Sequence, residues 1–249
     1  MSPNDDVTPK HSDPAGDPAI ALVTGGARGI GRQVAKRLVE EGLRVYIGAR
    51  DLERGRATAA EIGATAVMLE TTDDASVQSA VEEISGRERV LDVLVNNAGI
   101  QDGAMTAPME QDLDSMLAVY ATNVVGCVRV TNAFLPLLRE SRDPRIINVS
   151  SGTGSIRMLT DRNRYESKIA AISYPASKAA LNVVTAQYAK ALPWAFVAAA
   201  DPGSTQTDMN AGKGQHTVEE GSEVAVRLAL LPPSLPTGGF FDVTGQVAW

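Results

Sequence analysis

The sequence predicts one α/β domain built on a doubly wound parallel sheet of about seven strands, with helices on both faces. From Ile20 onward, short apolar runs alternate with longer segments whose apolar residues recur at helical spacing. The short runs are apolar on both faces, which is typical of parallel strands that helices cover on each side. Glycine-rich and polar motifs directly follow several of these runs, and parallel sheets bind ligands at that edge.

The individual elements follow from the same pattern, in order along the chain. Ile20–Thr24 is a short apolar run stopped by glycine, which predicts a buried strand. Ile30, Val34 and Leu38 then recur at helical spacing, and Gly42 marks the end of that helix. The alternation predicts further strands at Val45–Ile47, Ala64–Glu70, Val93–Val95, Ile146–Val149, Phe196–Ala199 and Gly239–Asp242. It predicts further helices at Leu52–Ile62, Asp74–Ile84, Asp112–Leu138, Tyr174–Leu192 and Val218–Leu231, with Pro136 kinking or ending its helix.

The composition suits a single globular unit. The chain has 249 residues, a net charge of −7 and 44% hydrophobic residues, which is enough for a substantial core. Residues 1–18 are rich in proline, aspartate and other polar residues, so we expect a disordered tail there and one domain over residues 19–249.

Composition also argues against several classes of function. The acidic balance argues against nucleic acid, whose phosphates need a basic surface. The single cysteine, Cys127, excludes an intrachain disulfide and fits a reducing cytoplasm, and His11 and His216 are too isolated for a metal site. No apolar run approaches the roughly 20 residues of a membrane helix, and the tail lacks the basic-then-apolar order of a signal peptide. We therefore expect a cytoplasmic protein without a metal, membrane or nucleic-acid partner.

A glycine cluster, Gly25, Gly29 and Gly31, follows the first predicted strand and opens the first predicted helix. Glycine allows a tight turn and lets backbone N–H groups approach a pyrophosphate, and the helix dipole adds partial positive charge there. An ordinary strand–helix turn is the alternative, but the strand and helix on either side favour a dinucleotide site.

The end of the second strand distinguishes between NADP and NAD. An acidic residue at that position would hold the ribose 2′-hydroxyl of NAD, but Ala49 stands there. Arg50 follows it and Arg28 lies in the glycine loop, and two guanidinium groups suit a 2′-phosphate. We therefore favour NADP over NAD. The arginines could instead be solvated surface residues, and Asp51 keeps NAD open if it turns inward.

Tyr174 and Lys178 stand four residues apart near the start of a predicted helix, so both side chains are expected on one face. A phenol beside an ammonium group is a more acidic proton donor than a free tyrosine. With a dinucleotide site upstream, this pair predicts hydride transfer to a carbonyl that Tyr174 protonates.

Together these motifs resemble the short-chain dehydrogenase/reductase family, most closely its NADPH-dependent carbonyl reductases. The resemblance runs from Ile20 to Trp249 and covers Thr-Gly-x-x-x-Gly-x-Gly from Thr24, Asn-Ala-Gly from Asn97 and Tyr-x-x-x-Lys. It implies a Rossmann-like fold with Tyr174 as general acid and Lys178 lowering its pKa. It also implies that Ser151 bonds the substrate carbonyl and that Asn123 holds a proton-relaying water. The expected cofactor-binding residues are Gly25, Arg28, Gly29, Ile30, Gly31, Arg50, Glu70, Thr71, Asn97, Ala98, Gly99, Tyr174, Lys178, Pro202, Gly203 and Thr207.

The sequence departs from that family at two functional places. Glu70 stands where an aspartate usually contacts adenine, and its extra methylene shifts the geometry. Ser151 and Tyr174 are also separated by an unusually long segment, near Ile156–Ile172, which should wall the substrate pocket. Tyr165 within it is a rival acid, but Lys168 follows it at i+3, so we favour Tyr174. In the carbonyl reductases a similar insertion covers the surface that pairs subunits, which predicts a monomer over a homo-oligomer.

The expected function is therefore NADPH-dependent reduction of a ketone, aldehyde or quinone. A sensor that binds NADP(H) without turnover is one alternative, although it has no need of Asn123, Ser151, Tyr174 and Lys178 together. A non-redox biosynthetic reaction at the same site is another, because a fold does not determine a function.

Overall fold

The computed structural model describes residues 17–101, 106–230 and 236–249. In that part of the chain an eight-stranded sheet has the order β3-β2-β1-β4-β5-β6-β7-β8. The strands are β1 (Ile20–Thr24), β2 (Arg44–Ala49), β3 (Thr65–Met68), β4 (Val93–Asn96), β5 (Arg145–Val149), β6 (Phe196–Ala200), β7 (Gly239–Asp242) and β8 (Gly245–Val247). Neighbours from β3 to β7 are parallel, and β8 pairs antiparallel with β7.

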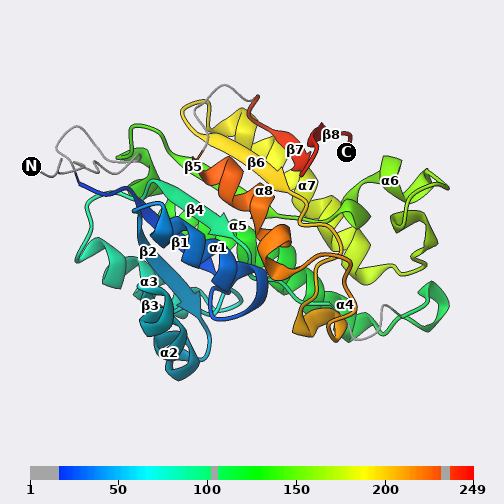
Figure 1. Cartoon of the computed structure of the whole chain (residues 1–249), viewed down its shortest axis with the longest axis horizontal. Coiled ribbons are helices and arrows are strands. Elements are labelled where there is room, and N and C mark those ends of the chain that lie inside the picture. The colour runs from blue at the N-terminus through cyan, green and yellow to red at the C-terminus, as the bar shows by residue number, and fades with distance from the viewer. Residues whose placement is uncertain (1–16, 102–105, 231–235) are drawn as a thin grey trace, which may run out of the picture.

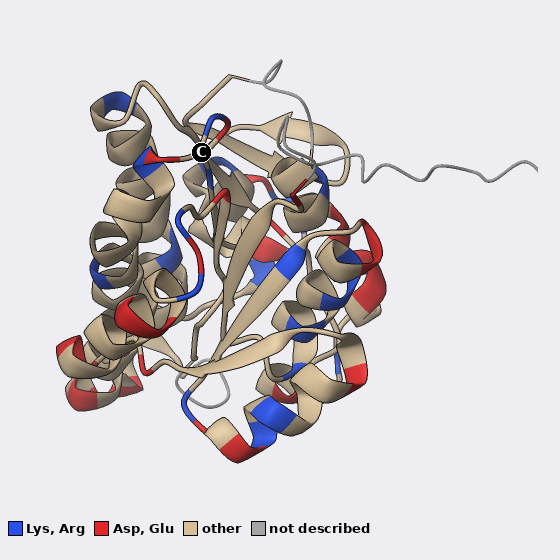
Figure 2. Cartoon of the chain, turned by 90° about the vertical axis from the view of Figure 1, so that its left-hand side faces the viewer, with Lys and Arg blue, Asp and Glu red and all other residues tan. Residues whose placement is uncertain are grey.

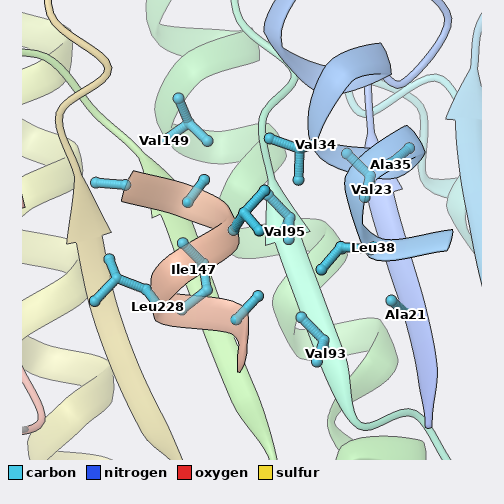
Figure 3. Packing of buried hydrophobic residues seen from close by; sticks show 14 of the residues in the cluster. Ala21, Val23, Val34, Ala35, Leu38, Val93, Val95, Ile147, Val149 and Leu228 are labelled. Atoms are coloured by element: carbon cyan, nitrogen blue, oxygen red, sulfur yellow. The ribbon is translucent and has the colours of Figure 1, made fainter. Parts of the chain in front are cut away.

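Helices cover both faces of the sheet, as the sequence predicts (Figure 1). The longer ones are α1 (Gly29–Glu40), α2 (Leu52–Ile62), α3 (Asp74–Ser85), α4 (Leu113–Tyr120), α5 (Cys127–Arg139), α7 (Ser173–Ala191) and α8 (Val218–Leu230). One apolar cluster packs residues of α1, α2 and α8 against the sheet, and a second packs residues of α3, α5 and α7 against it. Figure 3 shows the first cluster, in which Val34 and Leu38 approach the strands from α1. Lys, Arg, Asp and Glu lie mainly on the helices and connecting loops (Figure 2).

Local chemistry explains where several helices begin. Asp51, Asp73 and Asp112 each precede a helix and accept a hydrogen bond from its first backbone N–H groups. The side chain of Asp51 therefore turns toward α2, where it accepts from the Arg54 N–H at 3.0 Å. At the start of α1, by contrast, Arg28 makes no side-chain cap, so the first N–H groups of that helix are left to other acceptors.

The predicted helix Asp112–Leu138 is interrupted. A π-helical segment, Ala121–Gly126, separates α4 from α5, and such segments give no distinct apolar period in a sequence. Of the two outcomes predicted for Pro136, a kink or a helix end, the structure excludes the second, because α5 continues to Arg139. Strand β3 is also shorter than expected, so Glu70 lies beyond it. The predicted tail at 1–18 and the predicted helix end at Leu231 lie largely outside the described residues.

Within the described part of the chain, one helical stretch, Leu113–Arg139, is long and apolar enough by length and composition to cross a membrane, contrary to our expectation. Core helices of globular domains pass the same test, and Val130, Phe134 and Leu138 from this stretch are buried against the sheet. We therefore interpret it as a core helix of the α/β fold.

The long segment between Ser151 and Tyr174 forms short helical turns and α6 (Ile156–Thr160). Figure 1 shows α6 and α4 at the same end of the molecule. Ser155 caps α6 and also donates to the Ala248 carbonyl at 2.9 Å. Met158 is buried with Phe240, whose ring stacks on Trp249 at 5.5 Å between centroids. The inserted segment is thus anchored on β7 and the chain's last residues.

Candidate active site

A cleft of about 440 Å³ runs along the carboxyl ends of the parallel strands. It is lined by fifteen of the sixteen predicted cofactor-binding residues, and Gly203 is the exception. Tyr174 and Lys178 therefore lie in the same cleft as the glycine loop, although almost 150 residues separate the two motifs. Ala49 and Asp51, which the sequence places at the end of the second strand, also line the cleft. The lining further includes residues that the sequence did not single out: Ala27, Gly48, Arg54, Leu69, Thr72, Ile100, Thr122, Val149, Ser150, Asp208 and Met209.

The glycine loop requires glycine at specific positions. Gly25 and Gly29 have φ of +61° and +53°, which residues with a Cβ rarely adopt. A Cβ at Gly31 would lie 2.3 Å from Asn97 Nδ2, because that amide crosses the loop to donate to Thr24 O at 2.9 Å and Gly25 O at 3.2 Å. The loop therefore presents bare backbone at the uncapped start of α1.

Charged residues line the cleft within the glycine loop and after β2 and β3. Arg50 is exposed directly after β2 and, within the described residues, has no salt bridge. Arg28 instead pairs with Asp208 at 3.1 Å, and both side chains are at least half exposed. Glu70 Oε1 accepts from the backbone N–H and the hydroxyl of Thr72 at 3.1 and 2.9 Å. Arg54 also lines the cleft from the first turn of α2. Its position four residues after Arg50 is the signal that could have identified it.

Tyr174 and Lys178 both belong to the first turns of α7. Tyr174 is partly buried and Lys178 is 4% exposed, with Nζ donating to Val149 O at 2.8 Å and lying 5.6 Å from the Tyr174 ring centroid. Burial lowers the pKa of Lys178 to about 8, because a buried ammonium group loses hydration. Tyr165 lies outside the cleft lining and is 50% exposed.

The expectation that the pKa of Tyr174 is lowered is wrong for the protein without cofactor. Burial raises that pKa to about 12, the nearby charge of Asp201 raises it further, and a hydrogen bond from Ser151 opposes both effects. The ammonium group of Lys178 donates to the Val149 carbonyl, and its charge is not among the causes that set the pKa of Tyr174.

Ser151 and Asn123 have defined hydrogen-bond partners. Ser151 Oγ accepts from the Thr153 N–H at 3.2 Å and the Thr153 hydroxyl at 3.0 Å, so its own proton remains available to donate. Asn123 lies in the π-helical segment and is 1% exposed. Its amide joins the backbone of Ile100 at 2.8 and 2.9 Å to the hydroxyl of Ser177 at 3.0 Å. Asn123 thus connects the cleft floor to α7.

Comparisons with known proteins agree with this geometry. The model of the short chain dehydrogenase family matches residues 19–217. Among similar sequences, (+)-neomenthol dehydrogenase of Arabidopsis thaliana is 34% identical over 90% of this chain and 96% of the relative. Salutaridine reductase of Papaver bracteatum is 29% identical over 89% and 93% of the two chains.

Among solved structures, NADPH-bound carbonyl reductase from chicken fatty liver matches with a TM-score of 0.82 and 29% identity, over 93% of this chain and 99% of the other. Salutaridine reductase from Papaver somniferum matches with a TM-score of 0.78 and 28% identity, over 90% and 99% of the two chains.

Proposed function

The chain belongs to the short-chain dehydrogenase/reductase family of oxidoreductases, and we propose that it is an NADPH-dependent carbonyl reductase in which Tyr174 is the general acid. The observation that carries the proposal is one continuous cleft that is lined by the glycine loop and by Tyr174 and Lys178. The match to an NADPH-bound carbonyl reductase supports the choice of cofactor and reaction.

The residues present fit a dinucleotide. The glycine loop requires glycine at Gly25 and Gly29 for their positive φ and at Gly31 to avoid Asn97, and the uncapped start of α1 leaves backbone N–H groups for a pyrophosphate. Arg50 and Arg54 offer guanidinium groups to a 2′-phosphate, with Arg28 available once its surface pairing with Asp208 breaks. When bound, NADPH supplies the hydride. Lys178 would hold the adjoining ribose, because two of its three N–H donors remain after the bond to Val149 O.

The protein's own contribution is to stabilise and protonate the developing alkoxide. Ser151 donates a hydrogen bond to the substrate oxygen as negative charge develops there. Tyr174 transfers its phenolic proton to the same oxygen and then recovers a proton from water. The raised pKa of Tyr174 suits this role, because the phenol is protonated across the neutral range. The relatives include a (+)-neomenthol dehydrogenase and a salutaridine reductase, which supports a small-molecule carbonyl compound as substrate.

The test is NADPH oxidation, followed by absorbance, against cyclic ketones, open-chain aldehydes and quinones. We expect Tyr174→Phe to lower kcat by at least a hundredfold, on the order of a lost general acid, while NADPH binding persists. Tyr165→Phe is the matched control, because Tyr165 lies outside the cleft, and should retain turnover. NADPH binding without turnover of any carbonyl would instead favour a sensor or a non-redox enzyme.

A further inference from the structure

Asp201 is a buried carboxyl group that the proposed reaction does not use. It follows the last residue of β6, directly before Pro202 and Gly203, and is 4% exposed. Among the described residues no cationic side chain forms a salt bridge with it, so its charge is not neutralised by a direct partner. A buried acid without such a partner is costly, which calls for a reason for its presence.

The carboxyl group of Asp201 joins two loops of the cleft. It accepts the N–H of Gly203 at 2.9 Å, and its Oδ2 lies against the backbone of Gly152, the residue that follows Ser151. Because β5 and β6 are paired in register up to Val149 and Ala200, the residues after these strands lie side by side. Asp201 therefore fixes the Ser151 loop relative to the Pro202–Gly203 turn.

The inserted segment between Ser151 and Tyr174 packs against Gly152 beside Asp201. A Cβ on Gly152 would lie 2.9 Å from Asp201 Oδ2 and 2.6 Å from Glu166 Oε1, so both carboxyl groups crowd one backbone position. Arg164 holds Glu166 through Nε at 3.1 Å and through a second guanidinium nitrogen at 3.3 Å. Glu166 is thus neutralised by its own neighbour and docks the insertion against the Ser151 loop.

Several charged and titratable groups face Asp201 and the phenol from the surrounding elements. They are Tyr174 and Lys178 on α7, Glu166 and Arg164 on the insertion and Asp242 on β7; Cys127 on α5 acts on Lys178, and His216 lies beside Gly203. Burial raises the pKa of Asp201, and the charges of Glu166 and Asp242 act in the same direction, against the two backbone N–H donors. The charge of Asp201 in turn raises the pKa of Tyr174, after the larger effect of burial.

We propose that Asp201 is a positioning residue for the proposed reduction, which holds the Ser151 loop against the Pro202–Gly203 turn and places a negative charge near Tyr174. The inference rests on the proposed function and deepens it. A negative charge near Tyr174 favours its protonated form, which reduction needs, over its phenolate form, which the reverse oxidation needs.

The test compares Asp201→Asn with the parent in both directions over a range of pH. The amide retains the shape but loses the charge and one acceptor. We expect kcat for reduction to fall about tenfold, the order of one lost hydrogen bond. We also expect the alkaline fall of reduction and the alkaline rise of oxidation to move together to lower pH. NADPH affinity, measured by fluorescence, should change less than about twofold, because the glycine loop is untouched.

Asp112→Asn is the matched control, since Asp112 caps α4 by accepting from the Ser115 N–H at 2.7 Å and its charge is not among those that shift the pKa of Asp201 or Tyr174. Its pH profile should match the parent's. If Asp201→Asn does not fold, Asp201→Ser takes its place with the same expected profile. A parent that reduces no carbonyl refutes the proposed function. An active parent with an unshifted profile in the Asp201 variant refutes the role of Asp201 alone.

Discussion

The choice between NADP and NAD depends on Arg50, and the structure allows the effect of its removal to be estimated. Arg50 is exposed at the end of β2 and has no salt bridge within the described residues, so its guanidinium can bind a phosphate without losing a partner. Arg28 must first give up Asp208, 3.1 Å away. Arg50→Ala should therefore impair NADPH binding more than Arg28→Ala does.

A hydrogen bond to a charged group contributes about 1.5–3 kcal/mol, and the exposed position of Arg50 places it at the lower end. We expect Arg50→Ala to weaken NADPH binding by roughly 10- to 30-fold, since about 1.4 kcal/mol corresponds to a factor of ten. NADH lacks the 2′-phosphate, so its affinity should change less than about twofold. Asp208→Asn should have the opposite effect. It frees Arg28 from a surface ion pair worth at most about 1 kcal/mol, so NADPH should bind up to about fivefold more tightly.

The assay is a fluorescence titration of both dinucleotides with each variant at low and high salt. The preference of the parent for NADPH should shrink as salt increases, because the contact is exposed and screened. Equal losses of NADPH and NADH in Arg50→Ala would refute the assignment of the 2′-phosphate to this residue. A parent protein that binds NADH more tightly than NADPH would refute the assignment of NADPH as the cofactor.

Three further predictions follow from the structure. Gly31→Ala should displace the Asn97 amide from both carbonyls to which it donates, lower the free energy of unfolding by about 2–3 kcal/mol and lower Tm by roughly 4–12 °C. Gly86→Ala is the control, and its Tm should change little because Gly86 has a φ of −68°. Similar Tm values for the two variants would contradict the loop assignment. Burial raises the pKa of Asp201 above its value in the unfolded chain, so the parent loses stability as the pH rises from the unfolded pKa through the folded pKa. The Tm of Asp201→Asn relative to that of the parent should therefore increase from acidic to neutral pH. A constant difference in Tm would mean that Asp201 does not ionise in the folded protein. Light scattering should give the mass of one 26.2 kDa chain, and a dimer would refute the predicted monomer.

The architecture could be predicted because strands buried on both faces and amphipathic helices leave different apolar periods. Glycine at positive φ and the i,i+4 spacing of Tyr174 and Lys178 are equally local signals, and they located both ends of the cleft. The edge strand β8 was missed because its three residues, Gly245–Val247, are too few for a pattern. It exists because Asp242 and Thr244 form the turn that leads back along β7.

What the sequence could not predict comes from contacts between distant segments. Asp201 and Glu166 are 35 positions apart and meet only because the insertion folds back over Gly152. The pKa of Tyr174 was expected to fall because the sequence shows a lysine one turn away. The three-dimensional structure adds burial and a nearby carboxylate, which have the opposite effect. In the same way, the pairing of Arg28 with Asp208 joins residues 180 positions apart.

The π-helical segment Ala121–Gly126 makes chain length itself part of the site. A π-helical turn holds one residue more than an α-helical turn, so deleting one residue here would convert the segment to uniform α-helix without rotating α4 against α5. Phe134 in α5 is packed into the core, and α4 is packed beside α7, so both flanks stay in place and only the residues between them change register. The side chain of Asn123 would then leave Ile100. In an alignment of related enzymes, a one-residue gap in this stretch would therefore mark the loss of a functional anchor, even where every motif residue remained.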